Sequence, residues 1–459
     1  MLAWWIMLYL VGSLAVGAWA ARRVRTTEDY VLAGRSLSAP LVGVTLFATW
    51  YGPEFIMGVP GYFVAEGVMG TITDQFGTLL CLLLVAGLFA RRLYRLGIVT
   101  LSDYFRLRYG PRVELATSLI QVISYFPWIA AQFVALGYLF ELVVGIPVGQ
   151  GIMLGAGIVV AYTYVGGMWA VTLTDLLQSV VIVAGLAWVA LSLGSALPQG
   201  WVALLDAQPA GFYDLLPAPN VSAWSDYLAM WMAFGLGAIP SQEIYQRLFA
   251  ARSGRAGQAG VLLAGLLLFA IGAVPSVIGL GAATLYPELL DNAQGLVPMA
   301  VLQHTGLPAQ VLFFGALISA VLSTSSGAML APATVIGENL VRPRLPHLTD
   351  GQLLRWTRWS VVLVALIAGV FAFNDRHIHG LVVDSAVLLL VCLLAPLTVG
   401  LYWKGATRTG AWAAMVVGAG TWLLARQLIS PIDPTIWGTA ASFLAMFVGS
   451  HWPHRRAVT

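Results

Sequence analysis

Thirteen apolar stretches of about 18 residues or more follow one another along this chain, separated by short polar connections. Each is long enough to cross the hydrocarbon core of a bilayer as a helix. Together they occupy nearly all of the 459 residues, which leaves no room within them for a soluble catalytic, kinase or nucleic-acid-binding domain. The pattern therefore predicts one polytopic membrane protein that contacts lipid and no nucleic acid.

The composition supports this prediction, because only 9% of the residues are charged, whereas soluble domains carry about 25%. A lipid-facing backbone must satisfy its own hydrogen bonds, and the ten-residue alternation typical of barrel strands is absent from the sequence. We therefore predict an all-α integral membrane protein with 13 transmembrane helices. The predicted spans are 3–21, 38–67, 70–93, 113–143, 149–167, 169–195, 223–246, 256–285, 307–340, 352–374, 380–403, 408–427 and 435–452.

The positions of the basic residues predict the orientation. No basic residue precedes the first span, and four arginines follow it between 22 and 35. By the positive-inside rule the N-terminus is then outside the cell and, after thirteen crossings, the C-terminus is inside. With this topology all 23 Lys and Arg residues except Arg376 and Arg426 fall on the cytoplasmic side, the tail residues Arg455 and Arg456 included. A signal peptide is the alternative for the first span, but signal peptides begin with basic residues.

Two spans are interrupted in their middles by glycine and proline. The second span contains Gly52 and Pro53, and the seventh contains Gly235, Gly237 and Pro240. Proline has no N–H to donate, so a carbonyl one turn earlier loses its partner. The two spans are the second and the seventh, five crossings apart. Because an odd number of crossings reverses the direction of the chain in the membrane, two five-helix units that begin with these spans would lie in opposite orientations. Paired broken helices of this kind mark the binding site of secondary transporters. The alternative is that both are ordinary kinks.

Four carboxylates lie within or beside apolar spans: Glu54, Asp175, Glu243 and Asp384. A charge at the bilayer centre costs about 2.5–3.5 kcal/mol on insertion scales, so each requires a partner or a role. No basic residue lies within the spans of Glu54 and Asp175, which suggests neutralisation by a cation, a proton or a cationic solute. Three readings of Glu54 stay open: counter-ion to an amine, proton acceptor, or cap of the half-helix after the break. Glu243 and Arg247 are spaced as a structural ion pair and gate.

The ninth span carries four consecutive hydroxyl residues, from Ser323 to Ser326. Ala320, Ser323 and Thr324 share one face of a helix. Two hydroxyls, one carbonyl there, and the carbonyls of Ala48 and Tyr51 at the first break make five hard oxygen donors suited to Na+. Ser326, one turn further on, is placed to hold a second ion with Asp175. The alternative is that these hydroxyls bond back to their own helix or join neighbouring helices.

No enzyme signature is found. The histidines do not have metal-site spacing, and no glycine-rich phosphate loop or nucleophile elbow is present. His377 and His379 are predicted to lie in a solvated outer turn. Cys81 and Cys392 fall inside apolar spans and are interpreted as packing residues.

Several motifs resemble the sodium:solute symporter family. The strongest runs from Thr163 to Gln178 and reads TYVGGMWAVTLTDLLQ, similar to the family signature GG-x-x-AV-x-x-TD-x-x-Q. Further matches occur in the same order at 28–35, 100–108, 242–247 and 395–404. The resemblance implies the leucine-transporter-like fold and sodium-driven alternating access. It divides the chain into a leading helix and loop (1–37), a first repeat (38–195), an inverted second repeat (223–403) and two extra helices (408–452).

Carried over by position, the family's conserved sodium site falls on Ala48, Tyr51, Ala320, Ser323 and Thr324. The second sodium site of some members falls on Asp175, Ser323 and Ser326. This chain has Gly327 where such members carry a further Ser or Thr, which weakens the case for a second ion.

The combined hypothesis is a sodium-coupled symporter in the cytoplasmic membrane that imports a small organic solute such as an amino acid, an amine, a carboxylate or a vitamin. The solute would lie between the two breaks. Proline-type relatives carry an acid where this chain has a tryptophan at position 50, so a different solute is expected. Proton coupling and a non-transporting sensor module are the alternatives. The predicted solute-site residues are Trp50, Tyr51, Glu54, Trp128, Gln132 and Phe234, with Trp50 and Trp128 as aromatic gates.

Overall fold

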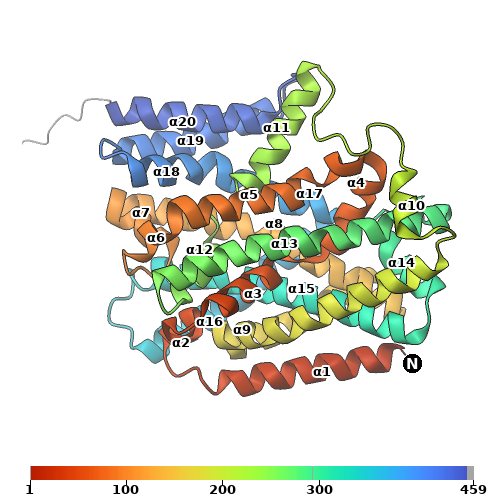
Figure 1. The fold of residues 1–459 in the computed structure, drawn as a ribbon. Coiled ribbons are helices and arrows are strands. Elements are labelled where there is room, and N and C mark those ends of the chain that lie inside the picture. The colour runs from red at the N-terminus through yellow and green to blue at the C-terminus, as the bar shows by residue number, and fades with distance from the viewer. Residues whose placement is uncertain (1, 292, 452–459) are drawn as a thin grey trace, which may run out of the picture.

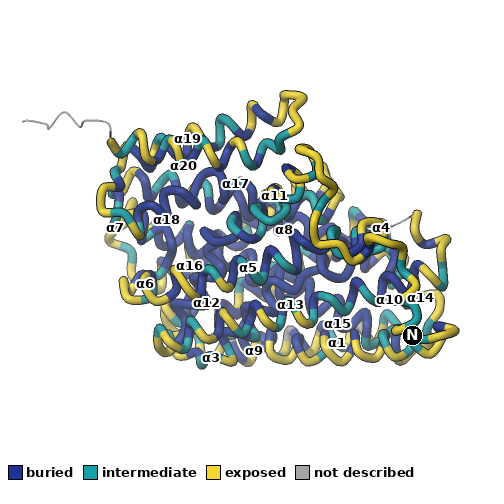
Figure 2. Tube along the Cα trace, turned by 45° about the horizontal axis from the view of Figure 1, so that its top comes forward, coloured by how far each residue is buried: buried dark blue, intermediate teal, exposed yellow. Residues whose placement is uncertain are grey.

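The computed structural model describes residues 2–291 and 293–451. Within them the chain is helical apart from turns and a single bridge between Leu37 and Ala251. Most helices run side by side in roughly parallel or antiparallel directions, with α1 along one edge of the bundle and α19 and α20 along the opposite edge (Figure 1). The buried residues concentrate between them, whereas α1 is mostly exposed along its length (Figure 2).

The helices have the following bounds in chain order. They are α1 Leu2–Ala21, α2 Thr27–Leu32, α3 Ala39–Trp50, α4 Val59–Glu66, α5 Gly77–Leu84, α6 Ala90–Tyr94, α7 Leu101–Tyr109, α8 Pro111–Val144, α9 Val148–Ala196, α10 Gly200–Asp206, α11 Val221–Gly235, α12 Gln242–Ala250, α13 Gly254–Leu285, α14 Leu296–His304, α15 Leu307–Val335, α16 Asp350–Asn374, α17 Ile378–Leu389, α18 Ala395–Tyr402, α19 Arg408–Ala425 and α20 Pro434–His451. Wider π-helical turns join several of them, at Glu54–Gly58, Ile72–Phe76, Val85–Phe89, Ile336–Val341 and Leu390–Leu394.

Helical segments coincide with the predicted spans. In the described part of the chain, eight helical runs are long and apolar enough to cross a membrane, and Ala39–Trp50 and Val148–Ala161 are shorter apolar helices. The protein is thus a multi-pass, all-helical membrane protein. The count of thirteen crossings, their direction and the division into two inverted repeats stay predictions.

Both predicted helix breaks are present. Helix α3 ends at Trp50, Tyr51 has non-helical angles (φ −81°, ψ 72°), and the chain becomes helical again at Glu54. Helix α11 ends at Gly235, and α12 begins only at Gln242. The last four carbonyls of a helix have no intrahelical donor, so each break exposes polar backbone groups inside the bundle.

The basic loops assemble at one end of the bundle, which we call the basic end. Arg35 donates to the carbonyls of Gly97 and Ile98, and the amide of Arg252 donates to the carbonyl of Leu37. Loops that are far apart in sequence therefore lie on the same side, as the predicted topology requires. Arg426, predicted to lie on the other side, pairs there with Asp384 at 3.5 Å. The tail residues Arg455 and Arg456 lie outside the described residues.

Capping boxes begin the short helices of the basic end. Thr26 accepts from the amide of Asp29 in α2, and Thr100 accepts from the amide of Asp103 in α7, with the reciprocal bonds present in both. This exchange satisfies two of the amides that a helix start leaves unpaired.

Helix α9 contains a sharp interruption at Gly167, whose φ of +53° and ψ of −158° are not helical. The predicted spans 149–167 and 169–195 are thus two helices that meet at this residue. A Cβ on Gly167 would lie 2.7 Å from the carbonyl oxygen of Tyr30, and the Tyr30 hydroxyl donates to the carbonyl of Thr163 at 2.8 Å. Only glycine fits this backbone and this contact, and the turn directs the second helix, with Asp175, into the bundle.

Candidate functional site

The two helix breaks meet in the centre of the bundle. Trp50 is the last residue of α3, and its Nε1 donates to Oε1 of Glu243 in the first turn of α12 at 3.0 Å. The Tyr125 hydroxyl, from α8, donates to the other carboxylate oxygen of Glu243. All three side chains are buried. Glu243 thereby ties three helices together beside the breaks.

Oxygen atoms of α3 and α15 face one another at the first break. The Thr324 hydroxyl lies 3.4 Å from the carbonyl oxygen of Ala48, and the Ser323 hydroxyl donates to Oδ1 of Asp175 at 2.6 Å. Ala48, Ala320, Ser323 and Thr324 are completely buried. The structure therefore brings the hydroxyls of the predicted ion site to the end of the broken helix.

The four consecutive hydroxyls divide into two pairs. Ser323 and Thr324 reach across to other helices, whereas Ser325 donates to the carbonyl of Val321 and Ser326 to the carbonyl of Ser323 on their own helix. Bonding back to the own helix thus holds for one pair, and contact with neighbouring helices for the other. Ser326 is not hydrogen-bonded to Asp175 here, and both ion sites stay predictions.

Asp175 lies in a more polar environment than its span suggested. Its Oδ2 accepts from the hydroxyl of Thr45, a residue that the sequence did not single out. The completely buried Arg247, in α12, exerts a charge effect on this carboxylate. No basic residue lies within the span of Asp175 itself, but Arg247 acts on it from the second broken helix.

Arg247 is held differently from the predicted ion pair. Its Nη1 donates to the main-chain carbonyl of Glu243 at 3.2 Å, and in the described part of the chain no carboxylate oxygen lies within 4 Å of its guanidinium. A Cβ on Gly327 would lie 2.6 Å from its Nη2 and 2.7 Å from Cγ2 of Thr49. The absence of a side chain at position 327 makes room for the guanidinium next to the first break.

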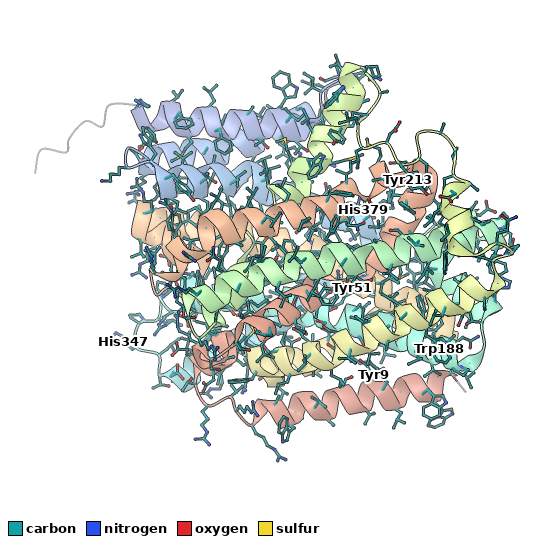
Figure 3. All side chains as sticks on the ribbon, in the orientation of Figure 1. Tyr9, Tyr51, Trp188, Tyr213, His347 and His379 are labelled. Carbon is teal, nitrogen blue, oxygen red and sulfur yellow. The ribbon has the colours of Figure 1, made fainter. Side chains whose placement is uncertain are left out.

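A cavity lies between the two breaks and α17, with a volume of about 430 Å³ that includes its open side. Four of the six predicted solute residues line it: Trp50, Glu54, Trp128 and Phe234. The other two lie behind this lining. The ring of Tyr51 stacks on Phe55 with 5.3 Å between centroids, in the interior of the bundle (Figure 3). Gln132 is buried, and its Nε2 donates to the carbonyl of Trp128 at 3.3 Å.

Close backbone contact explains one glycine of the second break. A Cβ on Gly237 would lie 2.7 Å from the carbonyl oxygen of Ala386 in α17, which is part of the cavity wall. The segment between Gly235 and Pro240 thus packs its backbone directly against α17.

Two functional candidates were missed in the sequence. Asp74 is buried and lines the cavity, and its Oδ2 lies 3.5 Å from Nδ1 of His379. The imidazole of His379 also packs on the ring of Tyr62 at 4.9 Å, so the prediction of a solvated turn is wrong for this residue (Figure 3). Asp74 lies four residues into its predicted span, where an acid is easily taken for an interfacial one. The signal that was available in the sequence was an acid, Asp74, within one apolar span and a histidine, His379, directly before another.

The comparisons with known proteins agree with one another. The model of the sodium:solute symporter family matches residues 30–418. The chain is 28% identical over 445 residues to the human high affinity choline transporter 1, covering 90% of this chain and 74% of the relative. It is 27% identical to an osmoregulated proline transporter of Bacillus subtilis, covering 91% and 87%. Among solved structures, a Na+-coupled sialic acid symporter in a substrate-bound outward-open state superposes with a TM-score of 0.85 at 18% identity, covering 98% and 97%.

Proposed function

Since the chain belongs to the sodium:solute symporter family, we propose that it imports a small organic cation of the quaternary ammonium class, with choline as the type compound, together with Na+ across the cytoplasmic membrane. Its family consists of transporters and not of enzymes, and it shares the leucine-transporter-like fold. The identity of the solute and the ion site are our proposals.

The observation that carries the choice of solute is the cavity lining. It combines the indoles of Trp50 and Trp128 with the ring of Phe234. A quaternary ammonium group is attracted to the faces of aromatic rings, by about 2 kcal/mol or more per contact when it is desolvated. Such a group has no N–H to donate, so aromatic faces suit it better than a set of hydrogen-bond acceptors.

The charges of the cavity favour the same class. Its lining contains three buried carboxylates, Glu54, Asp74 and Glu243. A solute with its own carboxylate, such as proline or sialic acid, would bring a like charge beside them, and such contacts are a common means of rejecting a partner. The choline transporters among the relatives are consistent with a cationic solute.

We assign Na+ to the carbonyls of Ala48, Tyr51 and Ala320 and the hydroxyls of Ser323 and Thr324. The 3.4 Å between the Thr324 hydroxyl and the Ala48 carbonyl supports this assignment. It exceeds the usual range of about 2.5–3.0 Å for an O–H···O bond, and two oxygens at this spacing can share one cation. Because the Ser323 hydroxyl donates its hydrogen bond to Asp175, the lone pairs of its oxygen are free to face the ion.

Coupling follows from the position of these oxygens. The ion would bridge the last turn of α3 to the unbroken helix α15, and Trp50 in that same turn lines the solute cavity. Binding of Na+ would therefore fix the part of the broken helix that contacts the solute. Each positive charge that enters is driven by about 2.3 kcal/mol per 100 mV of membrane potential.

Uptake into proteoliposomes tests the proposal. We expect labelled choline to accumulate under an inward Na+ gradient with a negative interior, and not when K+ replaces Na+. Labelled proline and sialic acid serve as comparison solutes. Uptake driven by a pH gradient without Na+ would show that the coupling ion is a proton and not sodium. Solute binding without counterflow would indicate a sensor. Preferred uptake of proline or sialic acid would overturn the choice of a cation.

A further inference from the structure

Two of the three carboxylates in the solute cavity, Asp74 and Glu54, keep an oxygen without a hydrogen-bond partner among the described residues, and of the three only Asp74 also lies within 4 Å of a basic side chain there. Glu243 accepts hydrogen bonds from Trp50 and Tyr125 on its two oxygens. Glu54 stands at the start of the half-helix after the break, where the helix dipole favours its negative charge. Asp74 is only 1% exposed, and its Oδ2 has no hydrogen-bond partner.

An imidazole from another helix contacts Asp74. Nδ1 of His379, at the start of α17, lies 3.5 Å from Oδ2 of Asp74. Asp74 lines the solute cavity, and His379 lines two outer cavities at the end of the bundle remote from the basic loops. The pair therefore stands in the wall between the inner cavity and the outer ones.

The outer cavities are acidic. Glu66 lines both of them, together with Asp226 and Asp433 in one and Asp291 in the other. Clefts lined by charges of one sign concentrate ions of the opposite sign. An organic cation that enters from this end would reach the imidazole of His379 and then the carboxylate of Asp74.

We propose that Asp74 is the residue that binds the cationic group of the solute, and that His379 is its counter-ion and the outer gate while the site is empty. The incoming cation takes the place of the imidazole at Oδ2, which separates α17 from the segment that carries Asp74 and opens the wall. This proposal rests on the proposed class of solute for the role of Asp74, but the gate can be tested without any solute.

The gate is tested by the reaction of a cysteine in the cavity. Ser385 lines the cavity on α17, and the two native cysteines are buried, so Ser385→Cys can be made in the natural chain. We expect His379→Ala to raise its rate of modification by a membrane-impermeant trimethylammonium methanethiosulfonate by about tenfold or more. The exposed position Ser222, changed to Cys, is the control and should react at one rate in both backgrounds. Equal rates at Ser385→Cys with and without His379 would overturn the gate.

The role of Asp74 is tested by removing its charge and comparing a cationic with an anionic thiol reagent. Asp74→Asn should lower the ratio between the rates of the trimethylammonium reagent and of a sulfonate reagent at Ser385→Cys, because the carboxylate attracts only the cation, whereas opening of the gate admits both reagents. It should also weaken choline binding about tenfold or more in a thermal-shift titration, with the stabilisation by Na+ retained. Asp206→Asn removes an exposed acid that lines neither the solute cavity nor the two outer cavities, and as the control it should bind choline as the natural chain does.

The outcomes separate this inference from the proposed function. If the natural chain binds no quaternary ammonium compound, the proposed solute class fails, while the two reagents still report on the gate and on the charge of Asp74. If choline binds and Asp74→Asn changes neither its affinity nor the selectivity between the reagents, the assignment of Asp74 fails and the proposed function stands.

Discussion

Trp50 donates the hydrogen of its indole to the carboxylate of Glu243, and this 3.0 Å bond joins the last turn before one helix break to the first turn after the other. The two breaks are 192 residues apart in sequence from Trp50 to Gln242 and belong to different predicted repeats. Both residues line the cavity, so this bond couples the two broken helices at the cavity wall.

Loss of this bond should weaken both stability and transport. Trp50→Phe keeps an aromatic face but removes the N–H, which leaves one oxygen of a buried carboxylate without a donor at a cost of about 1–3 kcal/mol. We expect a lower unfolding temperature and slower solute uptake. Trp188→Phe is the control, because Trp188 is 47% exposed on the bundle surface (Figure 3). Equal losses in both variants would argue against a special role for Trp50.

The consecutive hydroxyls of α15 offer a test of the sodium site with its own control. Ser323→Ala and Thr324→Val should each raise the Na+ concentration needed for half-maximal thermal stabilisation about tenfold, equivalent to about 1.4 kcal/mol. Ser325→Ala removes a neighbouring hydroxyl that bonds back to the carbonyl of Val321 and should leave the Na+ titration unchanged. A similar shift in Ser325→Ala would mean that the effect is structural.

Asp175 should matter more than its distance from the solute cavity suggests. Asp175→Asn replaces the charged acceptor of the Thr45 and Ser323 hydroxyls and removes the negative charge that acts on the buried guanidinium of Arg247, at a cost of about 1–3 kcal/mol. We expect a marked loss of thermal stability and of Na+ affinity. Asp384→Asn is matched to it, because Asp384 pairs with Arg426 at a half-exposed site, where the loss should be at most about 1 kcal/mol.

Gly327 should not tolerate a side chain. In Gly327→Ala the new Cβ would lie 2.6 Å from Nη2 of Arg247 and 2.7 Å from Thr49, so one of them must move. Overpacking of this kind costs about 1–3 kcal/mol, measurable as a lower unfolding temperature. Gly157→Ala, in α9 with open space around it, should be neutral or slightly stabilising. An unchanged unfolding temperature in Gly327→Ala would show that Arg247 does not need this space.

The fold and the first break were predictable because strong local signals carry them. A run of apolar residues favours a helix in lipid, and Pro53 and Pro240, each with glycine close by, favour an interruption. Proline alone was not sufficient, since Pro127, Pro275 and Pro332 lie inside continuous helices. The hydroxyls of Ser323 and Thr324 were predictable in the same way, since a helical repeat places them on one face. Which two of the four hydroxyls reach across depended on the neighbouring helices, and this the sequence did not contain.

The contacts of Asp175 and Asp74 were not predictable from spacing. Thr45 and Arg247 reach Asp175 from two other helices, and His379 reaches Asp74 across more than 300 residues of chain. Partners of this kind depend on how the helices are packed. The positive-inside pattern predicts the side on which each loop lies, but it says nothing of a single arginine that enters the bundle.

The burial of Arg247 has a consequence for the transport cycle. In the present conformation its guanidinium has one hydrogen bond, from Nη1, while Nε and Nη2 have none, and no part of it is exposed to solvent. Water satisfies such a cation far better than this packed interior does. Any rearrangement that lets water reach this residue from the basic end therefore recovers hydration energy, which favours a conformation that is open at that end over the present one.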